Sequence, residues 1–178
     1  MFSFSNISQF SNTDDYLPLL NAVLLTDLIV ITLLIIGWIP SKVLKEWYEK
    51  YSLSAVIADV LIILIGILLA RFLYPFFFSS YSLFSFTFLA VVIQIFHDFS
   101  FYGLFSVIPR GTNYMMDTFK DYGKESGIRA IIADSLMMIS ACVFGSFFKS
   151  LGKNSNIILL IFLVYLVPYF IYTRFTPS

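Results

Sequence analysis

The sequence predicts an all-α protein: a polytopic transmembrane helix bundle of about five spans, with two amphipathic helices at the membrane interface. Three observations support this prediction. The 178 residues are 59% hydrophobic and only 12% charged, whereas soluble domains carry about 25% charged residues. The apolar residues gather in runs of about 20, the length that crosses a bilayer as a helix. Gly and Pro stand at the ends of these runs, as helix breakers do.

The spans follow one another along the chain and form a single integral membrane domain over residues 1–178. Pro40 follows the first span, Pro75 follows the second, and a Pro109-Arg110-Gly111 turn follows the third. The start of the chain lacks the basic residues and the cleavage site of a signal peptide, so we expect the first run to remain in the membrane. The spans are predicted at about 17–38, 55–74, 83–105, 128–148 and 156–172.

Two connections between spans are amphipathic, and we expect them to form helices that lie in the membrane interface. Residues 41–52 place apolar side chains at helical spacing, with lysines and glutamates on the opposite face. Residues 112–127 repeat this pattern. The apolar faces are expected to contact the membrane surface or another protein through Trp47, Tyr48, Met115, Met116 and Phe119.

The distribution of basic residues predicts the orientation of the bundle. The side where the chain begins carries three of them, and Arg71 is expected to reach that interface by extending its side chain along the span. The opposite side carries the other eight. Because Lys and Arg are enriched in cytoplasmic loops, the N-terminus is expected to be lumenal or external and the C-terminus cytoplasmic. The Asn6-Ile7-Ser8 glycosylation pattern would then lie outside, close to the membrane.

Ionisable side chains within the spans are the candidate functional residues. Under this topology they fall in the half of the bilayer opposite to the N-terminus. A charged residue costs roughly 2.5–3.5 kcal/mol at the centre of a membrane helix, so these groups should face the bundle and contact one another. The single histidine could take a proton beside two or three acids and hold a negative neighbour. The predicted polar cluster consists of Asp27, Asp59, Gln94, His97, Asp98 and Asp134.

Small residues share the helix faces of two of these acids. They lie seven and eleven positions after Asp59 and after Asp134, where they would let neighbouring helices approach closely. The stretches AVIAD at 55–59 and AIIAD at 130–134 are related by the same offset of 75 residues, through an internal duplication or by chance among common residues. The predicted packing residues are Gly66, Ala70, Ala141 and Gly145.

Three stretches of the chain carry a resemblance to a known group of proteins: IQIFHDFSFY at 93–102, PRGTNYMMDTFKDYGKE at 109–125 and IIADSLMMIS at 131–140. They resemble small uncharacterised multi-pass membrane proteins of nucleocytoplasmic large DNA viruses, the giant viruses of algae and protists. The similarity covers residues 55–148. It implies residence in a virion inner membrane beneath an icosahedral capsid, and it carries over no catalytic residue.

Composition and motifs narrow the possible functions to three. A net charge of zero argues against nucleic acid as a partner. With one Cys and one His, and without the signature motifs of common hydrolases or nucleotide-binding enzymes, we expect no cofactor, no metal and no catalysis. The first expectation is a structural protein that links the membrane to capsid proteins, neighbouring membrane proteins or copies of itself. A proton- or cation-coupled transporter or channel and an intramembrane lipid-modifying enzyme are the alternatives.

Overall fold

The computed structural model describes residues 4–173, and in this range it confirms the all-helical bundle. Five of its helices are long and apolar enough to cross a membrane. Two shorter helices lie between spans, at the positions predicted for the amphipathic segments. The elements are η1 (Thr13–Asp15), α1 (Tyr16–Ile35), α2 (Lys42–Tyr51), α3 (Leu53–Phe77), α4 (Leu83–Val107), α5 (Tyr114–Ser126), α6 (Ile128–Lys149) and α7 (Lys153–Ile171).

Side-chain caps begin three of the α-helices. Ser41 accepts a hydrogen bond from the Leu44 N–H at the start of α2, and Ser82 accepts one from the Ser85 N–H at the start of α4. Asn113 accepts two backbone N–H groups in the first turn of α5. A cap of this kind satisfies amide donors that have no partner within the helix, so the polar residues between the apolar runs set the beginnings of α2, α4 and α5.

Helix α3 continues past Pro75 to Phe77, three residues beyond the approximate end predicted for the second span. Proline removes one backbone donor from a helix but leaves the next residues free to bond. The backbone N–H of Phe78 donates to the carbonyl of Tyr74 at 3.0 Å and closes the last turn. Proline alone therefore did not mark the helix end.

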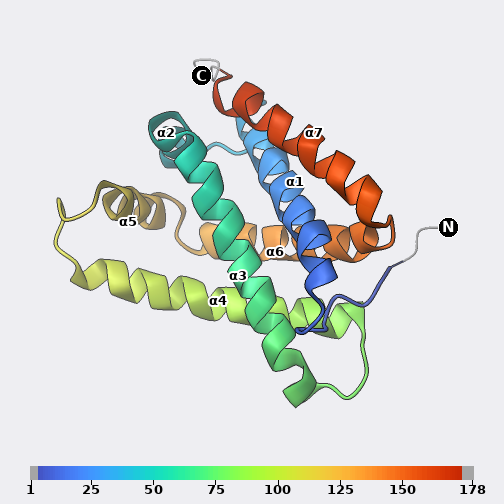
Figure 1. The fold of residues 1–178 in the computed structure, drawn as a ribbon. Helices are drawn as coiled ribbons and strands as arrows, with labels where there is room; N and C mark the ends of the chain where they lie inside the picture. Colours follow the sequence, from blue (N-terminus) through green and yellow to red (C-terminus); the bar gives the residue numbers. More distant parts are fainter. Residues whose placement is uncertain (1–3, 174–178) are drawn as a thin grey trace.

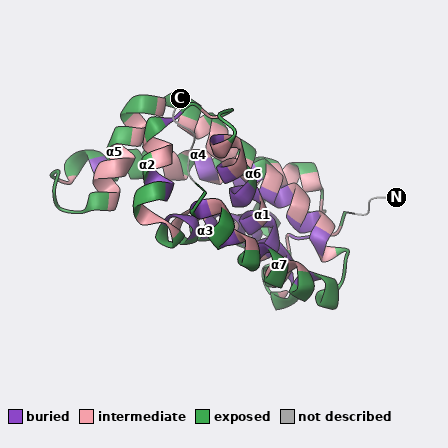
Figure 2. Cartoon of the chain, turned by 90° about the horizontal axis from the view of Figure 1, so that it is seen from above, coloured by how far each residue is buried: buried purple, intermediate pink, exposed green. Residues whose placement is uncertain are grey.

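The spans form two groups that cross one another (Figure 1). The axes of α1, α3 and α7 are similarly inclined, and α4 and α6 cross them. Helix α1 is the most buried of the spans, and it contacts α3, α6 and α7. In the most apolar stretch of α1, 61% of the residues are buried within the protein, against 17% in that of α4. In Figure 2 the buried residues accordingly concentrate on α1 and the helices beside it, with exposed faces outside them.

The alternating directions of the spans give the bundle two chemically different ends. Helices α2 and α5 lie together at one end and contact each other (Figure 1), and they define what we call the α2–α5 end. The described N-terminal segment lies at the other end, with the α3–α4 and α6–α7 connections. This second end is called the N-terminal end below.

Small residues lie where helices meet most closely. A Cβ atom added to Gly145 of α6 would lie 2.8 Å from the Cδ2 atom of Leu19 in α1. A Cβ atom added to Gly66 of α3 would lie 2.8 Å from the Cε atom of Met138 in α6. Both distances are shorter than a carbon–carbon contact allows, so the glycines permit these approaches. The other two predicted packing residues, Ala70 and Ala141, are fully buried.

We expect Gly145→Val to lower the free energy of unfolding by about 1–3 kcal/mol, the usual cost of forcing extra atoms into a packed contact. Gly103→Val is the matched control, because a Cβ at Gly103 meets no atom within 4 Å, and it should be close to neutral. The measurement is reversible unfolding in mixed lipid–detergent micelles. Equal effects of the two substitutions would contradict the close α1–α6 contact.

Candidate functional site: carboxyl groups beneath the α2–α5 cap

Helix α2 turns its aromatic side chains into the bundle and not toward the membrane surface. Trp47 is 3% exposed and Tyr48 is 1% exposed, so the expectation that they contact a partner or the membrane surface is wrong. The reason lies in the spans beneath, where carboxyl groups provide hydrogen-bond acceptors for the indole N–H and the phenol. Helix α2 is amphipathic as predicted, but its apolar face covers the end of the protein itself.

Three hydrogen-bond contacts join α2 to two spans. The Tyr48 hydroxyl lies 2.8 Å from Asp27 Oδ1 in α1 and 2.9 Å from Asp59 Oδ2 in α3. The Trp47 indole Nε1 donates to the same Asp59 oxygen at 2.9 Å. Burial, and then the neighbouring carboxyl groups of Asp59 and Asp27, raise the pKa of Tyr48 well above its ordinary value. The phenol therefore keeps its proton and remains available as a donor.

The second part of the predicted cluster lies on α4. The Gln94 amide donates to Asp98 Oδ1 at 2.7 Å, one helical turn away. His97 Nδ1 lies 3.3 Å from the same oxygen, and its ring packs against Phe101 with centroids 4.2 Å apart. His97 thus pairs with one acid, and not with the two or three that we expected. Adjacent positions on a helix point about 100° apart, so His97 and Asp98 cannot both face the acids of α1 and α3.

Asp134 of α6 connects the two parts electrostatically, since it is close enough to Asp98 and to Asp59 for their charges to act on it. Tyr122 of α5 covers this region. Burial and the charge of Asp134 raise the pKa of Tyr122 to about 12. The six predicted residues therefore form two groups. Asp27 and Asp59 are joined through Tyr48, and Gln94 and His97 both contact Asp98. Asp134 lies within electrostatic range of both groups.

Glu125 fastens α5 to the beginning of α2. Its carboxylate accepts hydrogen bonds from Ser41 Oγ at 2.6 Å and from the backbone N–H groups of Lys42 at 2.9 Å and Val43 at 3.2 Å. Negative charge is favourable at this position, where unpaired amides and the helix dipole meet. Partial burial opposes ionisation of Glu125, but the hydrogen bonds from Ser41, Lys42 and Val43 outweigh it and lower the pKa.

Aromatic contacts complete the cap. The Phe119 ring of α5 lies 4.7 Å from the Trp47 ring and 5.4 Å from the Phe105 ring of α4, measured between centroids. Met115 also packs partly buried against the core. Phe119 and Met115 therefore contact the protein itself, and Met116 is half-buried like them.

Acid should loosen the α2–α5 contact. Because the pKa of Glu125 in the folded protein is lower than its ordinary value of 4.5, the contact stabilises the fold fully above that value and is lost as pH falls through the folded pKa. Hydrogen exchange at the Lys42 and Val43 amides should then accelerate beyond its intrinsic pH dependence. Glu125→Gln should show fast exchange already at neutral pH, and Glu49→Gln on the exposed face of α2 should not. Protection in Glu125→Gln equal to that of the parent protein would contradict the contact.

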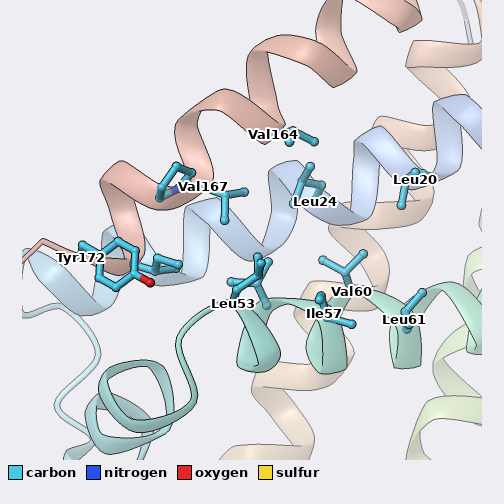
Figure 3. Close-up of a pocket in the computed structure, with 12 residues that line it drawn as sticks. Leu20, Leu24, Leu53, Ile57, Val60, Leu61, Val164, Val167 and Tyr172 are labelled. Atoms are coloured by element: carbon cyan, nitrogen blue, oxygen red, sulfur yellow. The ribbon is translucent and has the colours of Figure 1, made fainter.

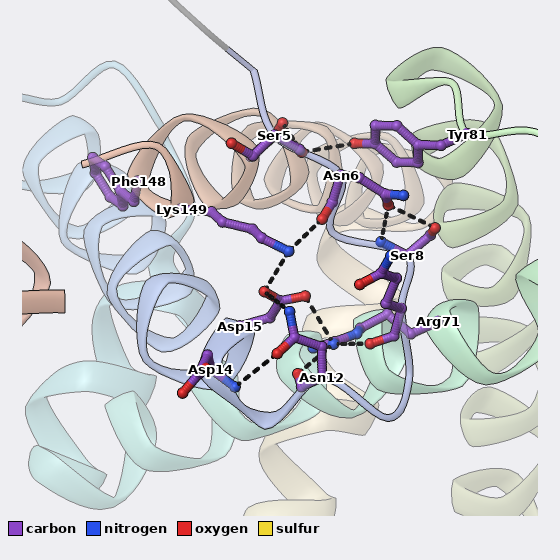
Figure 4. Close-up of polar contacts among 12 residues, drawn as sticks. Ser5, Asn6, Ser8, Asn12, Asp14, Asp15, Arg71, Tyr81, Phe148 and Lys149 are labelled. Atoms are coloured by element: carbon purple, nitrogen blue, oxygen red, sulfur yellow. Dashed lines mark hydrogen bonds and ion pairs between the residues drawn. The ribbon is translucent and has the colours of Figure 1, made fainter. Parts of the chain in front are cut away.

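A second polar cluster, not predicted from the sequence, closes the N-terminal end (Figure 4). Asp15 accepts from Arg71 at 3.0 Å and from Lys149 at 2.5 Å. The Arg71 side chain, which we expected to extend to this interface, is 0% exposed. Its Nη2 atom donates to the Asp15 carboxylate and to backbone carbonyls, while Nε and Nη1 have no hydrogen-bond partner. In the sequence, only the position of Asp15, an acidic residue directly before the first span, could have indicated this cluster.

The N-terminal segment folds over this cluster and supplies those carbonyls. Arg71 donates to the carbonyls of Gln9 and Asn12, the latter at 2.8 Å. The backbone N–H of Ser5 donates to the carbonyl of Ser146 at 3.0 Å. Ile7, between these contacts, is fully buried. Residues 5–12 therefore form a plug at the N-terminal end, held by α3 and α6.

Asp15→Asn should lower the free energy of unfolding by about 3–5 kcal/mol, the usual effect of removing one partner from a buried ion pair. It should also expose residues 5–12 to protease. The control is Asp14→Asn, because Asp14 is the exposed neighbour and its loss should change the unfolding free energy by less than about 0.5 kcal/mol. Similar stability of the two variants would show that Asp15 does not hold the plug.

Polar pairs also join the spans at intermediate depth. Asn21 of α1 donates to the carbonyl of Asn156 in α7 at 2.8 Å, and both residues are buried. Thr26 of α1 and Ser140 of α6 share a hydrogen bond of 3.0 Å. Each of these pairs provides a hydrogen bond that lipid cannot provide. Sequence reasoning missed them, although a polar residue inside an apolar run is the visible signal.

A groove with different chemistry lies between α3 and α7, with α1 at its base (Figure 3). Its volume is about 590 Å³. Apolar side chains such as Leu24, Val60 and Val167 line it, and Tyr172 lies at one end. Apart from the Tyr172 phenol, the described residues that line the groove are apolar, so the groove is suited to hydrocarbon.

Comparison with known proteins adds no homologue: no protein family, curated protein or solved structure matches the chain. Within residues 4–173, no group of three or more His, Cys, Asp or Glu side chains is arranged to hold a metal ion.

Proposed function

We propose that this chain is a structural, non-enzymatic membrane protein: a rigid bundle whose outer surface holds neighbouring proteins or copies of itself in a membrane. The observation that carries the proposal is that buried polar contacts close both ends of the bundle. At the α2–α5 end, Tyr48 and Trp47 bond to acids of two spans. At the N-terminal end, Asp15 pairs with Arg71 and Lys149 beneath the plug.

Closed ends favour support over transport. A transporter or channel needs a polar path that opens to at least one side of the membrane. In this bundle Asp27 and Asp59 share the Tyr48 hydroxyl, Asp98 pairs with Gln94 and His97, and the groove between α3 and α7 is apolar. Such contacts fix helix positions, which is what a protein that bears other proteins requires.

The outer face of α4 offers a surface for such neighbours. Phe84, Phe88, Phe96 and Phe99 are 81%, 59%, 75% and 60% exposed. They fall on one side of the helix at spacings of three, four and eight residues. Aromatic side chains contribute large contact areas with little loss of conformational freedom, so this face is suited to packing against another membrane helix as well as against lipid.

The location follows from the resemblance and from charge. The similarity to giant-virus membrane proteins supports a place in a virion inner membrane, where capsid proteins or neighbouring membrane proteins would be the partners. The excess of basic residues at the α2–α5 end supports a cytoplasmic position for that end. The plug would then face the lumenal or external side.

The test is proton flux in liposomes that contain the purified full-length protein. A structural protein should give the flux of empty liposomes across a pH gradient, with or without a membrane potential. Asp59→Asn should leave this background unchanged while lowering thermal stability, because the substitution alters the contacts to Tyr48 and Trp47.

The opposite result would support the transporter alternative. Flux well above background that disappears in both Asp59→Asn and His97→Ala would overturn the proposal, because it would assign the acids to a conducting path. The control is Asp121→Asn, since Asp121 is half-exposed and pairs with Arg110 outside the spans. It should behave as the parent protein in either case.

A further inference from the structure

The Tyr48 hydroxyl lies between two carboxyl groups, and this geometry determines how many protons the three side chains share. It is 2.8 Å from Asp27 Oδ1 and 2.9 Å from Asp59 Oδ2. Both distances are those of hydrogen bonds between oxygen atoms. A phenol has one hydrogen to donate, so it can donate to only one of the two acids. The other contact requires a hydrogen that belongs to a carboxyl group.

The surroundings of the two acids show which one carries that hydrogen. Asp59 Oδ2 accepts the indole N–H of Trp47 at 2.9 Å, and an indole nitrogen can only donate. An ionised carboxylate oxygen accepts two hydrogen bonds more readily than the hydroxyl oxygen of a neutral acid, so we assign the Tyr48 hydrogen to this oxygen as well. Asp27 Oδ1 must then donate to the Tyr48 oxygen.

The burial of Asp27 agrees with this assignment. Asp27 is 0% exposed, and its Oδ2 atom has no hydrogen-bond partner. An ionised carboxylate with an unpaired oxygen inside the bundle would carry a large desolvation cost, whereas the carbonyl oxygen of a neutral acid costs far less. An unpaired, buried Oδ2 is thus the expected state of a protonated Asp27.

We propose that Asp27, Tyr48 and Asp59 form a binding site for a single proton, which resides on Asp27 and is shared with Asp59 through the Tyr48 hydroxyl. A concerted shift would move the Asp27 hydrogen to the Tyr48 oxygen and the Tyr48 hydrogen to Asp59. The O–H bond of Asp27 breaks, a new O–H bond forms on Asp59, and the phenol ends unchanged. The inference is independent of the structural role proposed above.

The helices around the site supply further acids. Asp59 acts on Asp27, and Asp134 of α6 lies within range of Asp59. From α4, Asp98 acts on Asp134 and carries His97 beside it. Helix α5 contributes the neutral phenol of Tyr122, with Glu125 engaged at the beginning of α2. The only charged residue of α7, Lys153, begins that helix at the N-terminal end. Negative neighbours favour retention of the proton.

The bound proton also couples the position of α2 to pH. If Asp27 releases its proton to water, two carboxylates remain and the phenol can satisfy only one. One of the two contacts from α2 to the spans must then open. Alkaline pH should therefore loosen α2, in contrast to the acid effect expected at Glu125.

The test is infrared spectroscopy of the full-length protein in lipid nanodiscs at neutral pH. Aspartate labelled with ¹³C at the side-chain carboxyl separates the aspartic acid carbonyl band from the ester bands of lipid. We expect Asp27→Asn to remove one protonated carboxyl band from the spectrum. Asp121→Asn is the matched control and should leave this region of the spectrum unchanged.

A second variant keeps the test decisive if Asp27→Asn does not fold. Tyr48→Phe removes the hydroxyl but retains the ring, so the Asp27 band should shift or disappear as its hydrogen-bond partner is lost. A folded Asp27→Asn protein with the full parent band would overturn the proposal. An unchanged band in Tyr48→Phe would overturn it as well.

Discussion

The fold depends on one constraint: ionisable side chains inside a membrane bundle must find partners on other helices. The chain meets this constraint twice. At one end Tyr48 lies between acids of α1 and α3, and at the other Asp15 pairs with Arg71 and Lys149. Because lipid offers no hydrogen bonds, each group is satisfied only when the helices are assembled. The same polar groups that make an isolated span costly to place in lipid therefore specify how the spans pack together.

These contacts also explain why α2 packs into the bundle and why α5 packs onto α2. An amphipathic segment beside a membrane can rest on lipid headgroups, and the sequence of α2 is compatible with that. The carboxyl groups beneath it offer stronger partners, so Trp47 and Tyr48 turn inward and α2 covers the bundle. Glu125 then holds α5 to α2, which joins the two connecting segments into one cap. A cap and a plug leave the exposed apolar sides of the spans, those of α4 and α7 among them, as surfaces open to other molecules.

Hydropathy was sufficient to predict the five spans and the two connecting helices, because the length and composition of an apolar run decide whether it crosses a bilayer. The convergence of Asp27 with Asp59 followed from the cost of burying charge. The hydrogen-bond partners of the buried polar groups could not be predicted in the same way. Tyr48 looked like a membrane-facing residue because periodicity describes a face without saying what covers it. Arg71 looked able to reach water because its distance from the helix end was known but the fold of residues 5–12 was not. Contacts between distant segments carry no signal in local spacing.

A double-mutant cycle between Tyr48 and Asp27 measures most directly whether buried polar pairing holds the bundle together. The free energies of unfolding of Tyr48→Phe, Asp27→Asn and the double variant would be compared with that of the parent protein in lipid–detergent micelles. Hydrogen-bonded side chains in membrane proteins couple by about 0.6 kcal/mol on average and up to about 1.7 kcal/mol. We expect a stabilising coupling energy in the upper part of this range, because Tyr48 contacts both acids. Additive effects of the two substitutions would mean that Tyr48 and Asp27 do not depend on each other, and would contradict a bundle held together by buried polar pairs.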